Sequence, residues 1–222
     1  MKAMILAAGY GTRMGALTQK TPKPLLKVGG QPLIFYHLFA LANAGVEEVM
    51  INTGWLGEQL ENAIQDGEQF GLKVYYSREQ TPLETAGGIR KALPFFGGSP
   101  FIVVNADVWT DFDFSGLFLA ENRLAHLILV DNPEHHVAGD FVLQDAEVKQ
   151  STSAETLTFA GIGCYHPQLF TEYAPDENKL GVVLRQAMDA GKVSGEHHCG
   201  QWWDIGTPER LRTLDQQLLA SR

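Results

Sequence analysis

The sequence has few cysteines, no long apolar run and no excess of basic charge. Cys164 and Cys199 are its two cysteines, too few for a disulfide framework, and we expect both to be small core residues. No apolar run approaches the ~18 residues that a membrane-spanning helix needs. The N-terminus enters a strand directly, without the charged and apolar regions of a signal peptide. We therefore expect a cytoplasmic protein that does not bind membranes.

The charge balance of the chain is acidic. Its formal net charge is −9, from 17 Lys and Arg residues against 26 Asp and Glu residues. Nucleic acids and anionic membranes favour a basic face, so this balance argues against both as partners. Hydrophobic residues make up 45% of the 222 residues, which is ordinary for a globular chain of one domain, or of one domain with a small lobe. An anionic substrate would have to find local positive charge on this protein.

Two familiar phosphate-binding motifs are also absent. There is no G-x-x-x-x-G-K-[ST] sequence, which excludes a Walker loop, and Met14 fills the third glycine position of G-x-G-x-x-G. An apolar run does end in G-Y-G-T-R at residues 9–13, followed by T-P-K-P-L at residues 21–25. Glycines let the backbone offer N–H groups to phosphate oxygens, Arg13 can bind two oxygens at once, and Lys23 supplies a compact charge. These residues predict a triphosphate site; the alternative is a plain turn with exposed basic residues.

Strands and helices alternate over the first half of the chain. We expect strands at residues 2–8, 46–52, 72–77 and 101–104, and helices at residues 33–44, 56–65 and 85–93. This order predicts an α/β fold with a Rossmann-like, doubly wound, mixed but mainly parallel sheet. Ligands bind such sheets beyond the C-terminal ends of the strands, where residues 9–13 and 105–107 are both expected to lie.

The pattern changes after residue 111. Residues 126–130, 141–143 and 156–165 are β-like without full helices between them, which predicts a small β-rich insertion that carries substrate contacts. Helices are expected at residues 180–190 and 208–219, the second with Thr207 as its N-cap, and residues 145–155 suggest an exposed hairpin or loop. We expect a single domain with a nucleotide-binding part (1–111), a sugar-binding part (about 112–200) and a C-terminal part (201–222), and no further domain after Arg222.

Two aspartates follow strand-like segments. Asp107 comes after the apolar run at 101–104, and Asp204 lies within W-W-D-I-G-T-P. A carboxylate at the end of a strand, facing a phosphate turn, can hold Mg²⁺, which prefers one or two carboxylates plus phosphate and water oxygens. The alternatives are that Asp107 caps the loop that follows it and that Asp204 belongs to the cap of the last helix.

Five segments, in order, resemble the sugar-1-phosphate nucleotidyltransferase family: L-A-A-G-x-G-T-R-M, T-P-K-P-L, P-L-E-T-A-G-G, V-N-A-D-V-W-T-D and W-W-D-I-G-T-P. The resemblance covers nearly the whole chain. It implies an enzyme in which a sugar 1-phosphate attacks the α-phosphorus of a nucleoside triphosphate and pyrophosphate leaves. In one departure, many relatives carry Arg-Pro after the methionine of the glycine loop, where this chain has Gly15-Ala16. Arg13 and Lys23 are then the main cations of the loop.

The resemblance also implies roles for individual residues. Catalysis is expected from Arg13, Lys23, Asp107 and Asp204, with Mg²⁺ held by the two aspartates. The nucleotide is expected to contact Leu6, Ala7, Ala8, Gly9, Gly11, Thr12, Arg13, Lys23, Glu79, Glu84, Thr85 and Asn105. Relatives more often have glycine at the position of Glu84. The sugar phosphate is expected to contact Asn105, Asp140, Gly161 and Lys179, although Asp140 could instead be a surface-turn residue and Lys179 simply a solvated lysine.

The substrates follow from the same resemblance. Backbone recognition of an imide edge by the loop at residues 81–88 suits a pyrimidine such as uracil, so the expected partners are UTP and a sugar 1-phosphate. The segments D-N-P-E-H-H, F-A-G-I and L-R-Q-A-M-D-A-G-K-V-S-G-E-H resemble a short subgroup that acts on a muramic-type sugar in cell-wall recycling. Alternatives are thymidylyl or guanylyl transfer to glucose-, mannose- or heptose-type phosphates, and a non-catalytic sensor of nucleotide sugars. We expect a monomer or a weak dimer.

Overall fold

The computed structural model describes residues 1–150 and 155–220, so residues 151–154 of the expected hairpin or loop lie outside the described residues. The contacts within the chain define two compact units. Unit 1 comprises Met1–Pro82, Val104–Ser115 and Gln201–Arg222, and unit 2 comprises Leu83–Val103 and Gly116–Gly200. Strand β6 (Phe101–Asn105) contributes residues to both.

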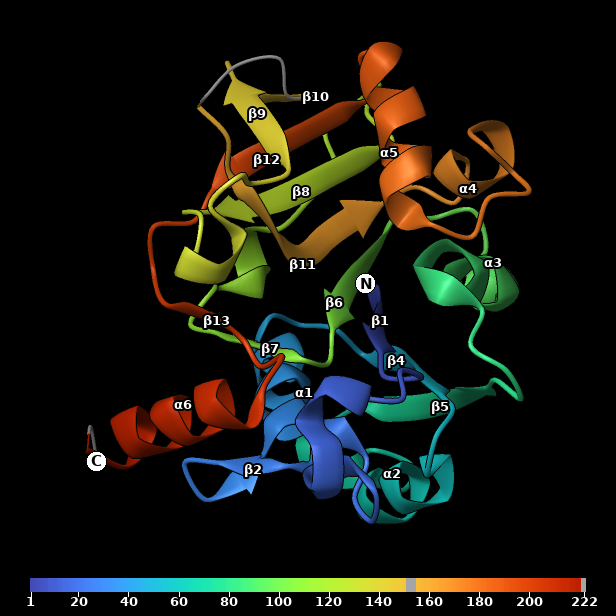
Figure 1. Cartoon of the computed structure of the whole chain (residues 1–222). Helices are drawn as coiled ribbons and strands as arrows, with labels where there is room; N and C mark the ends of the chain where they lie inside the picture. Colours follow the sequence, from blue (N-terminus) through green and yellow to red (C-terminus); the bar gives the residue numbers. More distant parts are fainter. Residues whose placement is uncertain (151–154, 221–222) are drawn as a thin grey trace. The chain divides into compact units, whose positions relative to one another are not determined.

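The sheet of unit 1 contains three parallel strands in the order β5-β4-β1 (Figure 1). They are β1 (Lys2–Leu6), β4 (Glu48–Thr53) and β5 (Lys73–Arg78), and Ile51 lies opposite both Ile5 and Tyr76. The middle of β1 is fully buried, as expected for a parallel strand covered on both faces. These strands, with helices between them, confirm the expected α/β class.

Two helices connect these strands. Helix α1 (Leu33–Asn43) ends where the sequence predicts, because Gly45 takes a φ of 79° and the N–H of Val46 returns to the carbonyl of Leu41 at 3.1 Å. Helix α2 (Gly57–Ile64) buries one apolar face through Leu60 and Ile64. Three short 3₁₀ segments complete this part, η1 (Thr12–Thr18), η2 (Lys23–Leu25) and η3 (Glu68–Phe70).

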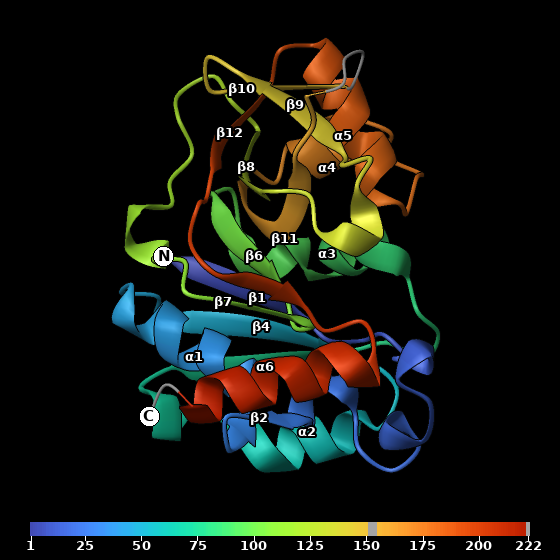
Figure 2. The same cartoon turned by 60° about the vertical axis from the view of Figure 1, so that its left-hand side comes forward.

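Two antiparallel ribbons and the last helix form a second packing layer in unit 1. The ribbons are β2 (Lys27–Val28) with β3 (Gln31–Pro32) and β7 (Val108–Thr110) with β13 (Trp202–Asp204). Helix α6 (Pro208–Ala220) lies beside β2 and η1 (Figure 2). A buried apolar cluster joins all of them; its members are Met14, Leu26, Val28, Leu33, Trp109, Ile205, Leu211 and Leu214, with Trp203 packed against it. This cluster fixes the β7–β13 ribbon from one side.

His37 on α1 supports the same ribbon from within the core. It is 2% exposed, and its Nε2 lies 2.8 Å from the carbonyl oxygen of Val108. Desolvation by burial lowers the pKa of His37 to about 4, although the hydrogen bond to Val108 opposes the shift. The folded protein therefore holds His37 neutral under conditions in which the unfolded chain would protonate it.

This depressed pKa predicts an acid-sensitive fold. Below pH 6.5 the unfolded chain binds a proton at His37, whereas the folded protein binds it only near pH 4. The free energy of unfolding therefore decreases as the pH is lowered from 6.5 to about 4. Between pH 7 and pH 5 we expect His37 to account for a loss of about 2 kcal/mol in the free energy of unfolding. Urea unfolding measures the free energy of unfolding at both pH values, and this free energy should change less between them in His37→Gln than in the parent protein. The exposed His135→Gln is the matched control, and an unchanged slope in His37→Gln would contradict the prediction.

Unit 2 contains a mixed set of strands in the order β11-β8-β12-β10-β9. Strand β8 (Ala125–Val130) pairs antiparallel with β11 (Thr158–Tyr165) and parallel with β12 (Val193–His197). Strand β10 (Glu147–Gln150) pairs antiparallel with both β12 and β9 (Phe141–Gln144). Its helices are α3 (Glu84–Phe96), α4 (Leu169–Glu172) and α5 (Leu180–Asp189), with η5 (Glu134–His136) and, at the unit boundary, η4 (Phe114–Gly116).

Three departures from the sequence predictions in unit 2 have a clear physical cause. Strand β12 was not predicted, because V-S-G-E-H has no apolar run. It forms a strand because it pairs with β8 and its first residues are buried there. Helix α3 continues past the expected end at residue 93 and through Pro94, since Phe96 in the added turn stacks on Phe101 at 3.8 Å between ring centroids. Cys164 is a core residue whose pKa burial raises to about 12, but Cys199 is exposed on the loop after β12, which contradicts the expectation for it.

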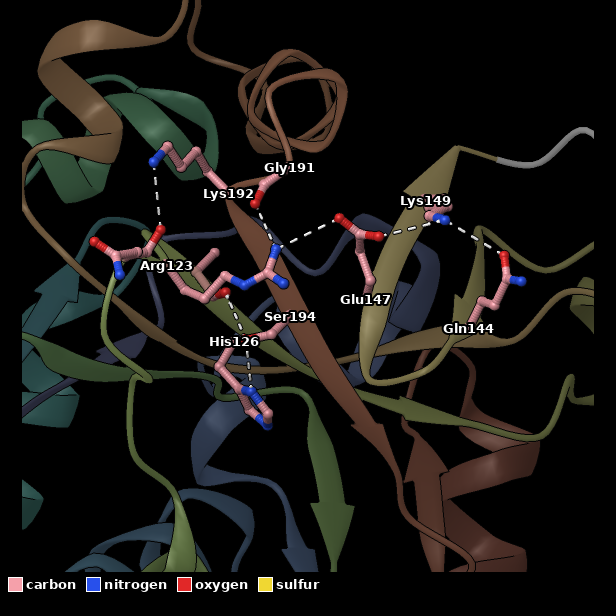
Figure 3. A network of polar contacts seen from close by, with 10 residues as sticks. Arg123, His126, Gln144, Glu147, Lys149, Gly191, Lys192 and Ser194 are labelled. Atoms are coloured by element: carbon pink, nitrogen blue, oxygen red, sulfur yellow. Dashed lines mark hydrogen bonds and ion pairs between the residues drawn. The ribbon is translucent and has the colours of Figure 1, made fainter.

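A polar network ties the outer strands of unit 2 to the end of α5 (Figure 3). Arg123 donates to the carbonyl of Gly191 just after α5 and pairs with Glu147 on β10 at 3.5 Å. Glu147 also pairs with Lys149 at 3.3 Å. This network holds the hairpin of β9 and β10 against the segments that flank β8 and β12.

Across the described residues, no helix is both long and apolar enough to cross a membrane.

Candidate active site

The glycine loop after β1 forms a tight turn with unused backbone donors. Gly11 has a φ of 62°, and a Cβ there would lie 3.1 Å from Thr18 and 3.2 Å from Lys23, so a side chain would not fit easily. The carbonyl of Gly11 accepts bonds from the Thr18 hydroxyl at 3.0 Å and from the N–H of Met14 at 2.9 Å. Within the part of the chain that the structure describes, the N–H groups of residues 9–11 meet no protein acceptor. Such a row of free N–H groups is suited to phosphate oxygens.

A second segment, residues 52–55 at the C-terminal end of β4, supports this loop. The Asn52 side chain accepts a hydrogen bond from the N–H of Ala7 at 2.7 Å, and both groups are buried. A Cβ on Gly54 would lie 2.5 Å from the carbonyl oxygen of Ala8, so only glycine permits this approach. The indole N–H of Trp55 donates to the carbonyl of Thr18 at 2.9 Å. This support was not predicted from the sequence, although a polar asparagine at the end of a buried strand is a visible signal.

Lys23 and Asp107 form an ion pair beside the loop. The Nζ of Lys23 lies 2.6 Å from Oδ2 of Asp107, and the Lys23 side chain is 9% exposed while that of Asp107 is 38% exposed. The N–H of Ala106 donates to the carbonyl of Leu6 at 3.0 Å, which fixes this segment next to the start of the glycine loop. The Asp107 carboxylate is thus directed to a catalytic lysine candidate rather than to a loop-capping N–H. The structure brings Leu6, Lys23 and Asp107 together as the sequence predicts.

The β7–β13 ribbon places Asp204 next to Asp107 along the backbone. Asp204 lies opposite Val108 in the antiparallel register, and the N–H of Ile205 donates to the carbonyl of Asp107 at 2.9 Å. The two aspartates are therefore close along the paired backbones although they are 97 positions apart in sequence. Asp204 is not the helix cap, because Thr207 accepts the N–H of Arg210 at 3.3 Å in that role. The cap alternative for Asp204 is thereby excluded.

Two arginines approach Gly206, just beyond Asp204. Arg210 donates through Nη1 to Oδ2 of Asp204 at 2.9 Å, and a Cβ on Gly206 would collide with its guanidinium. The same Cβ would lie 3.2 Å from Nη1 of Arg13. Arg13 is exposed, and none of the described carboxylates pairs with it. Arg210 was not predicted from the sequence; its position three residues after the N-cap Thr207 is the signal that could have indicated it.

The residues expected at the nucleobase divide between the two units. In unit 1, Glu79 is 8% exposed and its Oε1 accepts a hydrogen bond from the Asn52 amide at 2.8 Å, and Asn105 is half-buried at the end of β6. In unit 2, Glu84 begins α3 with a φ of 58° and an exposed side chain, followed by the half-buried Thr85. A φ of 58° is a conformation that glycine adopts most easily. This conformation agrees with the glycine that the family resemblance implies at this position, and it fits a contact made by the backbone.

The residues expected at the sugar all lie in unit 2. Both carboxylate oxygens of Asp140 are engaged, one by the N–H of Phe159 at 2.9 Å and the other by Nε2 of His136 at 3.0 Å. Gly161 has a φ of 74° within the irregular part of β11. Lys179 is exposed and is the N-cap residue of α5. Asp140 thus has a structural task, and its proposed contact with sugar stays a prediction.

Known proteins resemble this chain in sequence and in fold. Residues 2–141 match the family model described as nucleotidyl transferase. The N-acetylmuramate alpha-1-phosphate uridylyltransferase of Neisseria meningitidis serogroup B is 50% identical over 221 residues, which cover 96% of each chain. A mannose-1-phosphate guanylyltransferase catalytic subunit beta from Drosophila pseudoobscura is 29% identical over 96% of this chain, which spans 61% of that longer protein.

A solved structure shows the same fold. It is a crystal structure of a Bacillus anthracis protein assigned as a glucose-1-phosphate thymidylyltransferase, with a TM-score of 0.87 and 21% sequence identity, covering 99% of this chain and 95% of that one. The family model matches more than half of the chain, and the Neisseria relative covers 96% of it. The assignment of this chain to a family therefore rests on sequence as well as on fold. The chain belongs to the nucleotidyl transferase family, and it is an enzyme of the nucleotidyltransferase class.

Proposed function

We propose that this enzyme transfers UMP from UTP to N-acetylmuramate α-1-phosphate, giving UDP-N-acetylmuramate and pyrophosphate. The observation that carries the proposal is the 50% identity to the uridylyltransferase from Neisseria over 96% of both chains. The mannose-type relative is more distant and considerably longer. The proposal includes a role in recycling cell-wall sugars in the cytoplasm, by a monomer or weak dimer.

The two aspartates have the chemistry to hold Mg²⁺. The side chains of Asp107 and Asp204 are 38% and 21% exposed, and each is paired with a basic side chain, Lys23 and Arg210 respectively. Carboxylate oxygens are ligands that Mg²⁺ prefers. No group of three or more acidic, His or Cys side chains among the described residues could hold a metal ion, but Mg²⁺ needs only one or two carboxylates with substrate phosphates and waters. When bound, Mg²⁺ would neutralise charge on the phosphate oxygens.

The protein residues would mainly position the substrates and balance their charge. A phosphate monoester oxygen of the sugar attacks the α-phosphorus in line, and the bond to the pyrophosphate oxygen breaks. The free N–H groups of residues 9–11 hold phosphate oxygens, and Arg13, which has no carboxylate partner among the described residues, neutralises the departing pyrophosphate. Lys23 stays near the reacting phosphates through its bond to Asp107. No covalent intermediate with the protein is required.

A second candidate is guanylyl transfer to mannose 1-phosphate, which the guanylyltransferase relative favours. Glu79 does not separate the two, because a carboxylate can accept a hydrogen bond from the ring N–H of either uracil or guanine. The choice therefore depends on measurement with both nucleotides.

The test is pyrophosphate release by the purified protein with Mg²⁺, using UTP, dTTP, GTP, CTP or ATP against a panel of sugar 1-phosphates. The panel contains N-acetylmuramate, N-acetylglucosamine, glucose and mannose 1-phosphates. We expect the largest kcat/KM for UTP with N-acetylmuramate 1-phosphate. A preference for GTP with mannose 1-phosphate would favour the second candidate, and no release with any pair would favour a sensor that binds nucleotide sugars without turnover.

A further inference from the structure

Arg90 on α3 makes an unusual set of hydrogen bonds to a single loop of unit 2. Its Nε donates to the carbonyl of Phe170 at 3.1 Å, and its Nη1 donates to Oδ1 of Asn178 at 3.2 Å. Its Nη2 donates to the carbonyl of Ala174 at 2.8 Å and also to that of Glu177. One guanidinium thus binds the end of α4 and both ends of the loop at residues 174–178. The planar fork of arginine, with five N–H donors, is suited to such bridging.

The same loop is also held to the first turn of α3. The N–H of Ala86 donates to the carbonyl of Asn178 at 2.9 Å. A Cβ on Gly87 would lie 2.8 Å from Oδ1 of Asn178, so the asparagine side chain rests directly on that glycine. Helices α3, α4 and α5 contact one another around this point (Figure 1). The loop therefore takes its position from α3.

Lys179 follows this loop directly. Its N–H donates to Oε1 of Glu177 at 2.8 Å, its side chain is exposed, and α5 begins at the next residue. Apart from Phe170, every group that Arg90 binds lies within five residues before Lys179. The loop itself has no regular secondary structure, and Ala174 takes a φ of 43°, which is costly for a residue with a side chain. Arg90 therefore supplies three side-chain hydrogen bonds that hold this loop, in addition to the backbone bond between Ala86 and Asn178.

We propose that Arg90 is a positioning residue for Lys179, and that it sets the affinity for the anionic sugar substrate without touching that substrate. The proposal rests on the proposed function, since it needs a sugar 1-phosphate as substrate and the contact of Lys179 with it that the family resemblance implies. Arg90 acts by holding the loop at residues 174–178 against α3, so that the Lys179 ammonium is presented in one position. A lysine in place of Arg90 keeps the charge but can satisfy fewer of the carbonyl groups, so charge alone does not replace it.

The test is a kinetic double-mutant cycle in the full-length protein. We expect Arg90→Ala to raise the KM for the sugar 1-phosphate about 10-fold or more, because hydrogen bonds from a charged group are lost. The KM for UTP and the kcat at saturation should change by less than a factor of about three. Arg90→Lys should show most of the same defect. Arg185→Ala, on the exposed side of α5 and bonded within its own helix, is the matched control.

The cycle separates positioning from an independent role. If Arg90 acts through Lys179, the double variant Arg90→Ala/Lys179→Ala should have the same KM for the sugar 1-phosphate as Lys179→Ala alone. Additive effects, or an unchanged KM in Arg90→Ala, would overturn the proposal. A parent enzyme that is inactive with every substrate pair would instead refute the proposed function.

A second measurement needs no substrate. Trypsin cleaves after lysine, and the bond after Lys179 lies at the end of the loop that Arg90 holds. Limited trypsin digestion of Arg90→Ala should cut this bond faster than in the parent protein or in Arg185→Ala. An unchanged cleavage rate at Lys179, with the other sites also unchanged, would show that Arg90 does not order the loop and would overturn the proposal. Cleavage that is faster at every site would mean general unfolding of Arg90→Ala. In that case the cleavage rate at Lys179 in Arg90→Lys decides whether Arg90 orders the loop.

Discussion

Replacing Asp107 by asparagine is expected to lower kcat by roughly 100- to 1,000-fold, the usual cost of removing one preorganised electrostatic group. The amide has nearly the same shape but no charge, so both the ion pair to Lys23 at 2.6 Å and the proposed metal ligand are lost. Pyrophosphate release under saturating UTP and sugar 1-phosphate measures the effect. Thermal melting of the variant should show that the fold is retained, since Asp107 is partly exposed.

Asp113→Asn is the control for this variant. Asp113 is an exposed carboxylate six residues away that binds the N–H of Ser115 at 2.9 Å, and its loss should leave kcat unchanged. A Mg²⁺ titration then separates two roles of Asp107. A higher half-saturating Mg²⁺ concentration would support its role as a metal ligand, whereas a low kcat with unchanged Mg²⁺ dependence would mean that it acts through Lys23 alone. Near-normal turnover would remove it from the reaction.

The sequence predicted those parts of the structure that depend on local patterns. The alternation of apolar runs and helix signals placed β1, β4, β5 and α1 within a few residues of their observed bounds. Thr207 and Gly45 were predicted as helix-end residues because capping depends on residue type at one position. The glycine loop could also be identified, since only glycine tolerates the φ at position 11 together with the contacts there.

The parts that were not predicted depend on contacts that residue type alone does not specify. Asn52 supports the glycine loop from 45 residues away, and Arg90 binds a loop more than 80 residues away. Arg210 is close to Asp204 in sequence, but its direction toward that carboxylate depends on how α6 packs on the β7–β13 ribbon. Sequence patterns carry residue type and period, and neither of these specifies which distant carbonyl or carboxylate a side chain meets.

Removing the guanidinium of Arg13 should be nearly as damaging as changing Asp107. Arg13→Ala is expected to lose about 3 to 4 kcal/mol of transition-state stabilisation, a fall of roughly 100- to 1,000-fold in kcat/KM for UTP. The reason is that Lys23 and Arg210 each already neutralise a carboxylate, whereas none of the described carboxylates pairs with Arg13. Its charge is therefore available to the departing pyrophosphate.

Three further variants, at Arg13, Arg212 and Arg210, test whether the available charge of Arg13 is what matters. Arg13→Lys should recover part of the rate, because lysine supplies the charge without the two-oxygen geometry. Arg212→Ala, an exposed arginine on α6 bonded to the carbonyl of Pro208, should behave as the parent does. Arg210 lies near the same Gly206, and it would be the alternative cation for pyrophosphate if Asp204 held a metal ion instead of Arg210. A mild loss in Arg13→Ala together with a severe one in Arg210→Ala would therefore transfer the pyrophosphate role from the glycine loop to α6.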